Sequence, residues 1–594
     1  MDKNKRGEKR RKKFRVGGTV LYYDSNMNRH IADIDVDDGC DTVVFTLQEA
    51  SYVDVDVELS DSKKVFPDVR KIVIGSDITY IEIPNEMFPN VVKIESNNKY
   101  YLNADNILVC RQYGFTSLLN VFGTKENDVI DLKHCSKIEK NAFRGCKTKN
   151  IINTHYIDSI EENAFTGSAI IEDADKTKPL IKLNNMIIGV NDGFKEAVIR
   201  DEDFDGCIIE NCPFDKLEKL TICNYKLYLN KWNIRFPDTV EIKCNAMLFS
   251  SFKFLKILMN DIKKLIINNE HYITIDDSVY SKDMKQLYYV SKLKTGTFKV
   301  LDGVKAIESK AFCKSNISEI ILPDSLILIK KEAFYHCKSI SNIVFGKNLR
   351  FIGGMSFYNC KFNELTIPGT INEIRDSAFW WCDIDKINLK EGVCELGEDC
   401  FCRSKFKTDS IELPSSLYKL GESSLSEFKN IKFNSVFMSG LINSINRAKG
   451  ELVTFNINGQ NYYIPSLMDI DEKNIKSIEN DILINERKPQ YYYDLYKNIT
   501  DTNLKHKMAI EIYFKTHDEE IKKYIRKIGT TFVKNALTGT VDEEYFIKVL
   551  KLNLLTPQAL KKALEIAQMR NLVMISSYIM DLLNDEQKNS SFSL

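Results

Sequence analysis

Hydrophobic and polar positions along the middle of this chain follow a phrase that returns at a nearly constant step. The copies read Ile-x-x-x-Ala-Phe or a close variant, and they end at Phe312, Phe334, Phe357, Phe379 and Phe401. The steps between these residues are 22, 23, 22 and 22 positions, and a weaker copy ends at Leu425. A repeat in this range predicts a solenoid, in which each unit buries its apolar face only by stacking on its neighbours.

A second phrase, apolar-x-x-apolar-x-apolar, lies between successive copies of the first. Ile317–Leu322 and Phe362–Ile367 are examples, and a proline follows each of them. The alternation at its end is typical of a short strand with one buried face, and proline ends a strand because it cannot donate to the ladder. Stacked copies therefore predict a parallel sheet along one wall of the solenoid, with the phenylalanines filling the space between coils.

Together the two phrases resemble the repeat of the BspA-like, treponemal-type leucine-rich repeat family, which reads roughly L-x-x-I-x-L-P-x-x-L-x-x-I-G-x-x-A-F-x-x-C. The match is clearest over about residues 299–433, and Val69–Ile74 and Leu217–Ile222 resemble fainter copies. The resemblance implies a curved β solenoid used in protein recognition, and it implies no catalytic residue. It also leads us to expect β-hairpin insertions near residues 100–122, 180–200 and 274–300.

The predicted fold class is mainly β: an irregular leucine-rich-repeat solenoid with a parallel sheet, an N-terminal β cap and a C-terminal all-α domain. The expected segments are a basic disordered tail at 1–16, the β cap at 17–66, the solenoid at 67–433, a β-hairpin and linker at 434–485, and the α-helical domain at 486–594.

The flanking segments carry their own local signals. Tyr52–Leu59 alternates with period two, which predicts a half-buried strand that covers the first coil. Asn458–Gly459 between two apolar runs predicts a hairpin. Thr556–Pro557 supplies an N-cap and a proline at the first helical position, and apolar residues follow at helical spacing.

Charge is balanced over the whole chain but not along it. The formal net charge is +0, yet residues 1–15 hold nine Lys or Arg against Asp2 and Glu8, so the tail carries +7 and the rest −7. Such a tail can bind nucleic acid or an anionic membrane, but a solvated leader is the more common explanation. No apolar run of signal-peptide type follows it, so we expect a cytoplasmic protein, with a surface or secreted location as the alternative.

The fifteen cysteines follow the repeat. Cys146, Cys337, Cys360 and Cys382 each lie three residues after the motif phenylalanine, where other copies have Ser168, Ser315 and Ser404. A position that accepts either residue needs a small, weakly polar side chain, and free buried thiols behave as small hydrophobes. No C-x-x-C pair occurs, so we expect reduced structural thiols and no metal site.

No motif in the sequence indicates catalysis. None of the seven histidines stands in a recognisable catalytic or zinc-binding motif, and the glycine pairs Gly17–Gly18 and Gly353–Gly354 are not phosphate-binding loops. We therefore expect no enzyme activity, no catalytic residue, no cofactor and no bound metal.

Two rows of side chains are candidates for partner binding. The residues after the motif phenylalanine are aromatic in three successive copies, and equal positions of successive coils stack in space. This first row comprises Tyr335, Tyr358 and Trp380, with Trp381 beside the last. The second row comprises the residues expected to point outward from the sheet on the concave wall: Glu319, Ile321, Asn342, Val344, Glu364, Thr366, Lys386, Asn388, Ser410 and Glu412. An aromatic row can anchor a partner or only stiffen the solenoid, and both interpretations stay open here.

The function predicted from these features is a non-enzymatic protein–protein interaction scaffold with a protein partner. Three acids against one lysine in the outward row make a poor phosphate groove, so nucleic acid is disfavoured as a ligand except through residues 1–15. The alternatives are a cell-surface or secreted adhesin of the BspA-like type, a nucleic-acid-associated protein that uses the basic tail, and an enzyme without recognisable motifs.

Overall fold

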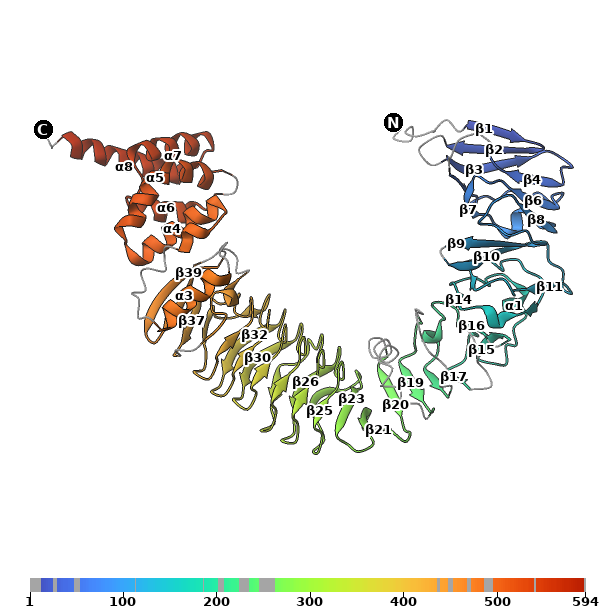
Figure 1. Ribbon diagram of the computed structural model, residues 1–594, viewed down its shortest axis with the longest axis horizontal. Coiled ribbons are helices and arrows are strands. Elements are labelled where there is room, and N and C mark those ends of the chain that lie inside the picture. The colour runs from blue at the N-terminus through green and yellow to red at the C-terminus, as the bar shows by residue number, and fades with distance from the viewer. Residues whose placement is uncertain are drawn as a thin grey trace. The chain divides into compact units, whose positions relative to one another are not determined.

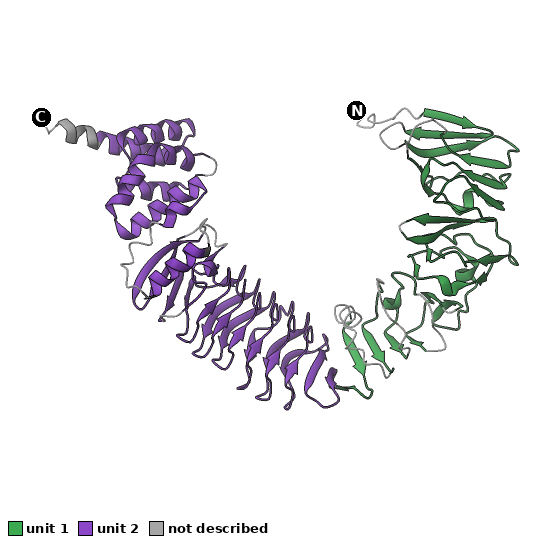
Figure 2. Cartoon of the chain, in the orientation of Figure 1, with its two compact units in different colours: residues 1–274 green, residues 275–594 purple. Residues whose placement is uncertain are grey.

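A computed structural model gives the fold of the chain. It describes residues 12–591 except for 25–28, 48–53, 113, 185, 201–207, 224–233, 245–261, 435–437, 447–451, 467–471, 485–494 and 539–540. Two compact units divide the chain, residues 1–274 and residues 275–594 (Figure 2). Residues 1–11, most of the predicted basic tail, lie outside the described residues.

Unit 1 begins with antiparallel strands and continues as parallel ones (Figure 1). The first sheet has the order β1 (Lys12–Val16), β2 (Thr19–Asp24), β3 (Arg29–Val36), β5 (Val55–Glu58) and β7 (Ile78–Glu82). Its first three strands pair antiparallel, whereas β3, β5 and β7 pair parallel. A second, parallel ladder consists of β4 (Thr42–Phe45), β6 (Lys71–Ile74) and β8 (Lys93–Ser96).

Two of the predicted boundaries are wrong in this region. Residues 12–16, which we assigned to a disordered tail, form strand β1 because Phe14 and Val16 pack against the hydrophobic core. The parallel coils begin at β3 and β4, inside the range 17–66 that we assigned to a cap, and Val43 and Phe45 are already fully buried there.

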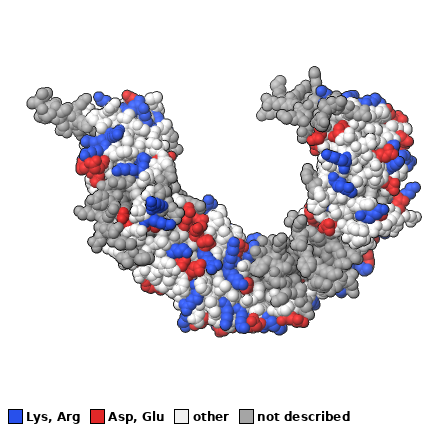
Figure 3. Space-filling view, in the orientation of Figure 1, with Lys and Arg blue, Asp and Glu red and all other residues white. Residues whose placement is uncertain are grey.

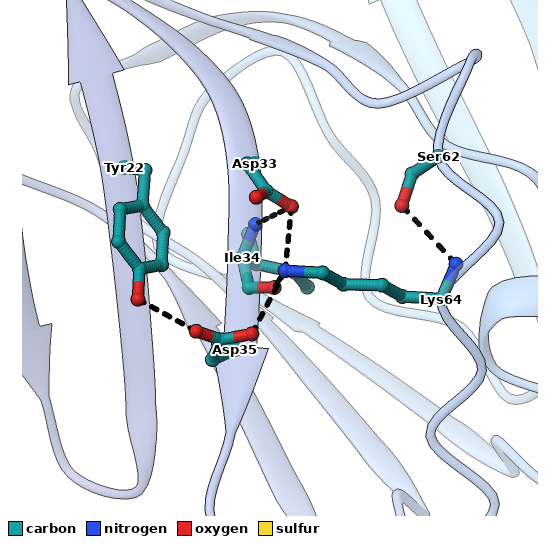
Figure 4. A network of polar contacts seen from close by, with 6 residues as sticks. All are labelled: Tyr22, Asp33, Ile34, Asp35, Ser62 and Lys64. Atoms are coloured by element: carbon teal, nitrogen blue, oxygen red, sulfur yellow. Dashed lines mark hydrogen bonds and ion pairs between the residues drawn. The ribbon is translucent and has the colours of Figure 1, made fainter. Parts of the chain in front are cut away.

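A polar network holds the start of unit 1 together (Figure 4). The Nζ atom of Lys64 lies 2.9 Å from Asp33 Oδ1 and 2.8 Å from Asp35 Oδ1, and it donates to the carbonyl of Ile34 at 2.9 Å. The hydroxyl of Tyr22 donates to the other oxygen of Asp35 at 2.6 Å. Hydrogen bonds from Lys64 and Tyr22 lower the pKa of Asp35. The network therefore connects β2, β3 and the segment that follows β5.

Antiparallel hairpins occur inside each of the three ranges where the sequence predicts insertions. The hairpin strands are β9 (Ile107–Gln112) with β10 (Phe115–Val121), β15 (Leu180–Leu183) with β16 (Met186–Val190), and β22 (Ser278–Ser281) with β23 (Gln286–Val290). The strands that follow in unit 1 pair parallel. β12 (Lys137–Ile138) pairs with β10 and with β14 (Ser159–Ile160), and β11 (Val129–Asp131) pairs with β13 (Asn150–Ile152). One further sheet contains β17 (Glu196–Ile199), β18 (Lys219–Ile222), β19 (Thr239–Ile242) and β20 (Lys264–Ile267). Among the described residues of unit 1, the helical pieces are α1 (Ala169–Glu172) and the 3₁₀ turns Asn85–Met87, Thr154–Tyr156 and Phe214–Lys216.

The repeats of unit 2 form two ladders, in which most strands pair parallel, rather than the single sheet that we predicted. β21 (Tyr272–Ile275) lies at the boundary of the two units. Within unit 2, the longer ladder runs in the order β22, β23, β25 (Ala306–Ile307), β27 (Leu328–Ile329), β29 (Phe351–Ile352), β31 (Glu373–Ile374), β33 (Glu395–Leu396) and β36 (Lys419–Leu420). Most of its strands are two residues long, and the second residue of each is the Ile or Leu that opens the first phrase. A search for alternating apolar residues does not detect such strands, because it needs at least four residues.

The predicted wall is the second ladder, and it comes in three sections. These are β24 (Thr295–Lys299), β26 (Asn316–Ile321) and β28 (Asn342–Val344); β30 (Lys361–Ile367), β32 (Asp383–Leu389) and β34 (Lys405–Phe406); and β35 (Ser410–Glu412), β37 (Asn430–Phe433), β38 (Leu452–Ile457) and β39 (Gln460–Pro465). The last two strands form the hairpin predicted at Asn458–Gly459, whose φ angles of 50° and 84° suit this dipeptide.

The motif phenylalanines fill the space between the coils as predicted. Consecutive ring centroids lie 4.6, 4.8, 5.1 and 5.6 Å apart along the series Phe312, Phe334, Phe357, Phe379 and Phe401. All five side chains are fully buried. Because each ring packs against the rings of the adjacent coils, each coil needs its neighbours to bury its own phenylalanine.

Helices complete unit 2. They are α3 (Glu472–Ile484), α4 (Thr502–Thr516), α5 (Glu519–Ala536), α6 (Glu543–Lys551), α7 (Pro557–Met569) and α8 (Val573–Ser591), and a 3₁₀ turn at Asn443–Ile445 precedes them. The N-cap predicted at Thr556 is confirmed, because its side chain accepts from the N–H of Ala559. Helix α3 corrects the prediction of a hairpin and linker over 434–485.

The predicted fold class is confirmed: the chain is mainly β, with parallel coils and a C-terminal group of helices. Helices α4 to α8 share one hydrophobic core of their own, in which Ile510, Phe532 and Leu560 are buried. Among the described residues, no helix is both long and apolar enough to cross a membrane.

Candidate protein-interaction surface

The backbone at one corner of each coil sets the positions of the predicted aromatic row. The second residue after the motif phenylalanine is left-handed in each coil, with φ of 60° at His336, 55° at Asn359 and 62° at Trp381. Its N–H donates to the next coil, as from His336 to the carbonyl of Tyr358 at 2.8 Å. This repeated hydrogen bond holds the aromatic side chains of adjacent coils next to each other.

The aromatic row, defined as Tyr335, Tyr358, Trp380 and Trp381, is in mutual contact. The rings of Tyr335 and Tyr358 stack with their centroids 4.7 Å apart and their planes 10° apart. Tyr358 meets Trp380 edge-on at 5.5 Å and Trp381 edge-on at 6.3 Å. Such contacts stabilise by about 0.5–1.5 kcal/mol per pair beyond area burial. These contacts favour the interpretation that the row stiffens the solenoid.

One residue of the aromatic row is exposed to solvent. Tyr335, Tyr358 and Trp380 are half-buried, whereas 51% of Trp381 is exposed. An exposed tryptophan supported by packed aromatic neighbours is the usual form of an interface anchor, because little side-chain entropy is lost on binding. The two interpretations of the row are thus compatible, with one residue suited to bind a partner.

Cations and a neutral histidine surround the row. The guanidinium of Arg403 lies 5.9 Å from the ring centroid of Trp380. Burial, followed by the charges of Lys338 and Lys314, lowers the pKa of His336, whose Nδ1 lies 2.8 Å from Nδ2 of Asn359. Arginine beside tryptophan is a common composition for a binding hot spot.

The predicted outward row of the wall lies on its solvent side, with Glu319, Ile321 and Asn388 half-buried and the other members exposed. The carboxylate of Glu319 accepts from Thr297 at 2.8 Å and from Asn342 at 2.7 Å. These hydrogen bonds lower the pKa of Glu319. Hydrogen bonds from the neighbouring strands therefore already hold this carboxylate in position.

Similar contacts continue along the wall. Glu364 accepts from Lys386 at 3.1 Å and from Asn388 at 2.8 Å, and Glu412 pairs with Lys432 at 2.9 Å. Thr366 accepts from Asn388 at 3.3 Å. Basic and acidic side chains are interspersed over the visible face of the repeats (Figure 3). A partner at this wall has to compete with existing contacts, so we regard the wall as secondary to the aromatic row.

Exposed hydrophobic residues that sequence reasoning missed lie at the longer ladder. They are Ile327, Phe351 and Tyr418, at or directly before two-residue strands. The available signal was a large apolar residue one or two positions before the buried Ile or Leu that starts the first phrase. We did not predict these strands, and therefore did not predict which side chains point away from them.

The Cys or Ser three residues after the motif phenylalanine is a hydrogen-bond donor to the preceding coil. Cys360 donates to the carbonyl of Phe334 at 3.0 Å and Cys382 to that of Phe357 at 2.9 Å. Ser404 makes the same bond to Phe379 at 2.6 Å. Burial raises the pKa of Cys382 to about 12, so this thiol is protonated and able to donate.

No group of three or more His, Cys, Asp or Glu that could hold a metal ion is found within the described part of the chain. The histidines and cysteines near the aromatic row contact backbone carbonyls or ring edges instead.

The stacked coils with two parallel ladders define a leucine-rich-repeat solenoid. The family described as BspA type leucine rich repeat region matches in six copies, within residues 120–187, 264–384, 305–432 and 351–468. The repeat region of this chain therefore belongs to the BspA-type leucine-rich repeat family, as the two phrases predicted.

Solved structures give a weaker comparison. A leucine rich cell surface protein from Faecalibacterium prausnitzii is 15% identical, with 71% of this chain and 94% of that chain covered and a TM-score of 0.25. The pneumococcal vaccine antigen PcpA is 14% identical, with 71% and 93% covered and a TM-score of 0.22. A leucine-rich repeat protein from Bacteroides ovatus is 14% identical, with 73% and 92% covered and a TM-score of 0.20. A search of curated proteins finds no match.

Proposed function

We propose that this protein is a non-enzymatic scaffold that binds another protein through the aromatic row. The observation that carries the proposal is Trp381, a half-exposed tryptophan held in place by Tyr358 at one corner of a regular stack. The membership of the repeats in the BspA-type family supports a repeat protein of this kind. Repeat solenoids present extended surfaces, and the bound partner is decided by exposed side chains rather than by the core.

A protein partner fits this surface better than a nucleic acid does. Tryptophan, tyrosine and arginine are enriched at the centres of protein interfaces, and all three types meet at Trp381, Tyr358 and Arg403. On the nearby wall, Lys386 is paired with the carboxylate of Glu364, and carboxylates repel phosphate. No catalytic step is part of the proposal.

The test compares the intact chain with Trp381→Ala in capture of partner proteins from native cells. Truncation of a central tryptophan costs about 2 kcal/mol or more of binding free energy, so we expect the partner to be depleted at least about tenfold. Phe351→Ala is the matched control, because it removes another exposed aromatic ring from the repeats. The thermal unfolding of both variants should remain close to that of the intact chain.

Unchanged capture by a folded Trp381→Ala variant contradicts the role of the aromatic row. Recovery of nucleic acid alone, lost on removal of residues 1–15, contradicts the scaffold proposal itself. The cytoplasmic location stays a prediction from the sequence, and fractionation of native cells distinguishes it from the surface adhesin.

A further inference from the structure

Unit 1 contains a groove that no sequence motif marks. It has a volume of about 1030 Å³, and its lining comes from β5, the edge strand β7, the hairpin β9–β10 and the segment around β12. The parallel ladder that contains β7 ends at this strand, and the hairpin occupies the following section of chain. The groove is therefore a product of the interrupted repeat.

Side chains hold the groove in shape and occupy the free edge of β7. Gln112 donates to the carbonyl of Thr79 at 2.9 Å, and Asn120 donates to the carbonyl of Ile83 at 2.7 Å. An incoming strand would have to displace these hydrogen bonds to pair with β7. A ligand of this groove is for that reason held by side chains and not by strand addition.

Negative charge predominates in the lining. Five carboxylates and three cations line the groove, and Lys137 is already shared by Glu139 at 2.9 Å and Glu161 at 2.5 Å. Arg144 pairs with Glu86 at 2.7 Å, and Lys140 is exposed. Most of the positive charge in the lining is thus engaged.

Three carboxylates of the lining are not paired with these cations: Asp54 directly before β5, Asp56 in β5 and Glu82 in β7. Asp54, Asp56 and Glu82 make no ion pair with any described residue; Asp56 accepts from the hydroxyl of Thr79 at 2.9 Å, and Glu82 accepts from that of Tyr80 at 3.0 Å. Neutral donors leave the negative charge in place, so this rim attracts cations.

Two exposed aromatic rings belong to the same groove. Tyr80 is 46% exposed and Phe115 is 47% exposed. Burial, followed by the charge of Glu82 and then of Glu58 and Glu139, raises the pKa of Tyr80 to about 12. The neighbouring charges of Glu82, Glu58 and Glu139 also favour a cation over the face of this ring.

We propose that this groove binds a basic, extended peptide segment of a partner protein, with lysine or arginine side chains over Tyr80 and Phe115 and next to Asp56 and Glu82. Alternating basic and apolar residues match this mixture of carboxylates and rings. Nucleic acid has the wrong charge for the rim. The site lies in unit 1 and is independent of the function proposed for the aromatic row.

The test measures binding of a fluorescein-labelled synthetic decapeptide of alternating lysine and leucine to the full chain by fluorescence anisotropy. We expect saturable binding that weakens about tenfold in the double variant Asp56→Asn, Glu82→Gln, because two carboxylates at one rim are lost. Tyr80→Leu keeps an apolar side chain but removes the ring face, and we expect about threefold weaker binding.

The control is Glu126→Gln with Asp158→Asn, the same change of charge at two exposed carboxylates of unit 1 outside the groove lining. This variant should bind the peptide as the intact chain does, and so should Trp381→Ala. Equal weakening in the control and groove variants, binding that both groove variants leave unchanged, or no saturable binding overturns the proposal. A decapeptide of alternating glutamate and leucine should not bind.

Discussion

The coils of unit 2 and the coils of unit 1 both bury apolar side chains between adjacent coils, but they differ in regularity. In unit 2, five motif phenylalanines stack in one continuous series, and a Cys or Ser in each of three successive coils donates to the preceding one. In unit 1, Phe143 and Phe165 stack at 4.7 Å, and hairpins β9–β10 and β15–β16 interrupt the parallel strands.

The difference shows what a constant repeat length produces. When the step is 22 or 23 residues, equal positions lie next to each other, so each residue type forms a row through the stack. The aromatic row is one such product. When an insertion breaks the step, rows end and a groove opens beside the edge strand β7. Regular coils thus create ridges of like side chains, whereas irregular coils create concave sites.

The largest effect should come from the phenylalanine stack. Phe357 is fully buried between Phe334 and Phe379, so we expect Phe357→Ala to lower the free energy of unfolding of the repeats by about 3–5 kcal/mol. Phe165→Ala in unit 1 removes a ring that stacks on Phe143, and we expect a smaller loss. Hydrogen exchange of the surrounding amides measures both, and equal losses would contradict the comparison.

The next effect concerns the thiol and hydroxyl donors. Cys360→Ala leaves the buried carbonyl of Phe334 without its donor and should cost about 1–3 kcal/mol. Cys360→Ser should retain most of the stability, since Ser404 makes the same hydrogen bond two coils further on. Chemical denaturation of the two variants checks this prediction, and a serine variant as unstable as the alanine variant would show that packing of sulfur, not the hydrogen bond, is what matters.

A smaller effect should appear where α3 meets the last coils. Glu479 is buried and accepts from the N–H of Ile442 at 2.8 Å and of Gly440 at 3.3 Å. Burial raises the pKa of Glu479, although these N–H groups act in the opposite direction. A raised pKa means that the stabilising contribution is present below the unfolded pKa and is lost as pH rises through the folded pKa.

Glu479→Gln keeps an acceptor oxygen and removes the charge. We therefore expect the melting temperature of the variant, relative to the intact chain, to increase as the pH rises above the ordinary Glu pKa of about 4.3. A difference that does not depend on pH would show that Glu479 titrates normally in the folded protein.

The smallest effect belongs to the network at the start of unit 1. Lys64 is partly exposed, so Lys64→Met should cost only about 0.2–1 kcal/mol, and added salt should reduce the loss. The lowered pKa of Asp35 gives the opposite sign to Glu479: its contribution is present above the unfolded pKa and is lost as pH falls through the folded pKa. Stability that is unaffected by acid in this region would count against the network.

The repeat sequence was sufficient to predict the solenoid and the family. Ile-x-x-x-Ala-Phe places a small residue and a ring at the same corner of every coil, and a constant step leaves one simple way to stack them. The same reasoning placed Tyr335, Tyr358 and Trp380 in one row, since equal positions must become neighbours. The N-cap at Thr556 was also predictable, because capping depends on residues within one turn.

Other features depended on the tertiary structure. The two-residue strands of the longer ladder have no periodicity of their own and exist because adjacent coils pair there. Trp381 is more exposed than the half-buried Trp380, and this difference follows from the backbone at the corner of the coil, which is left-handed at position 381. The acidic groove joins residues from 54 to 161, whose proximity comes from how irregular coils pack and not from any local pattern.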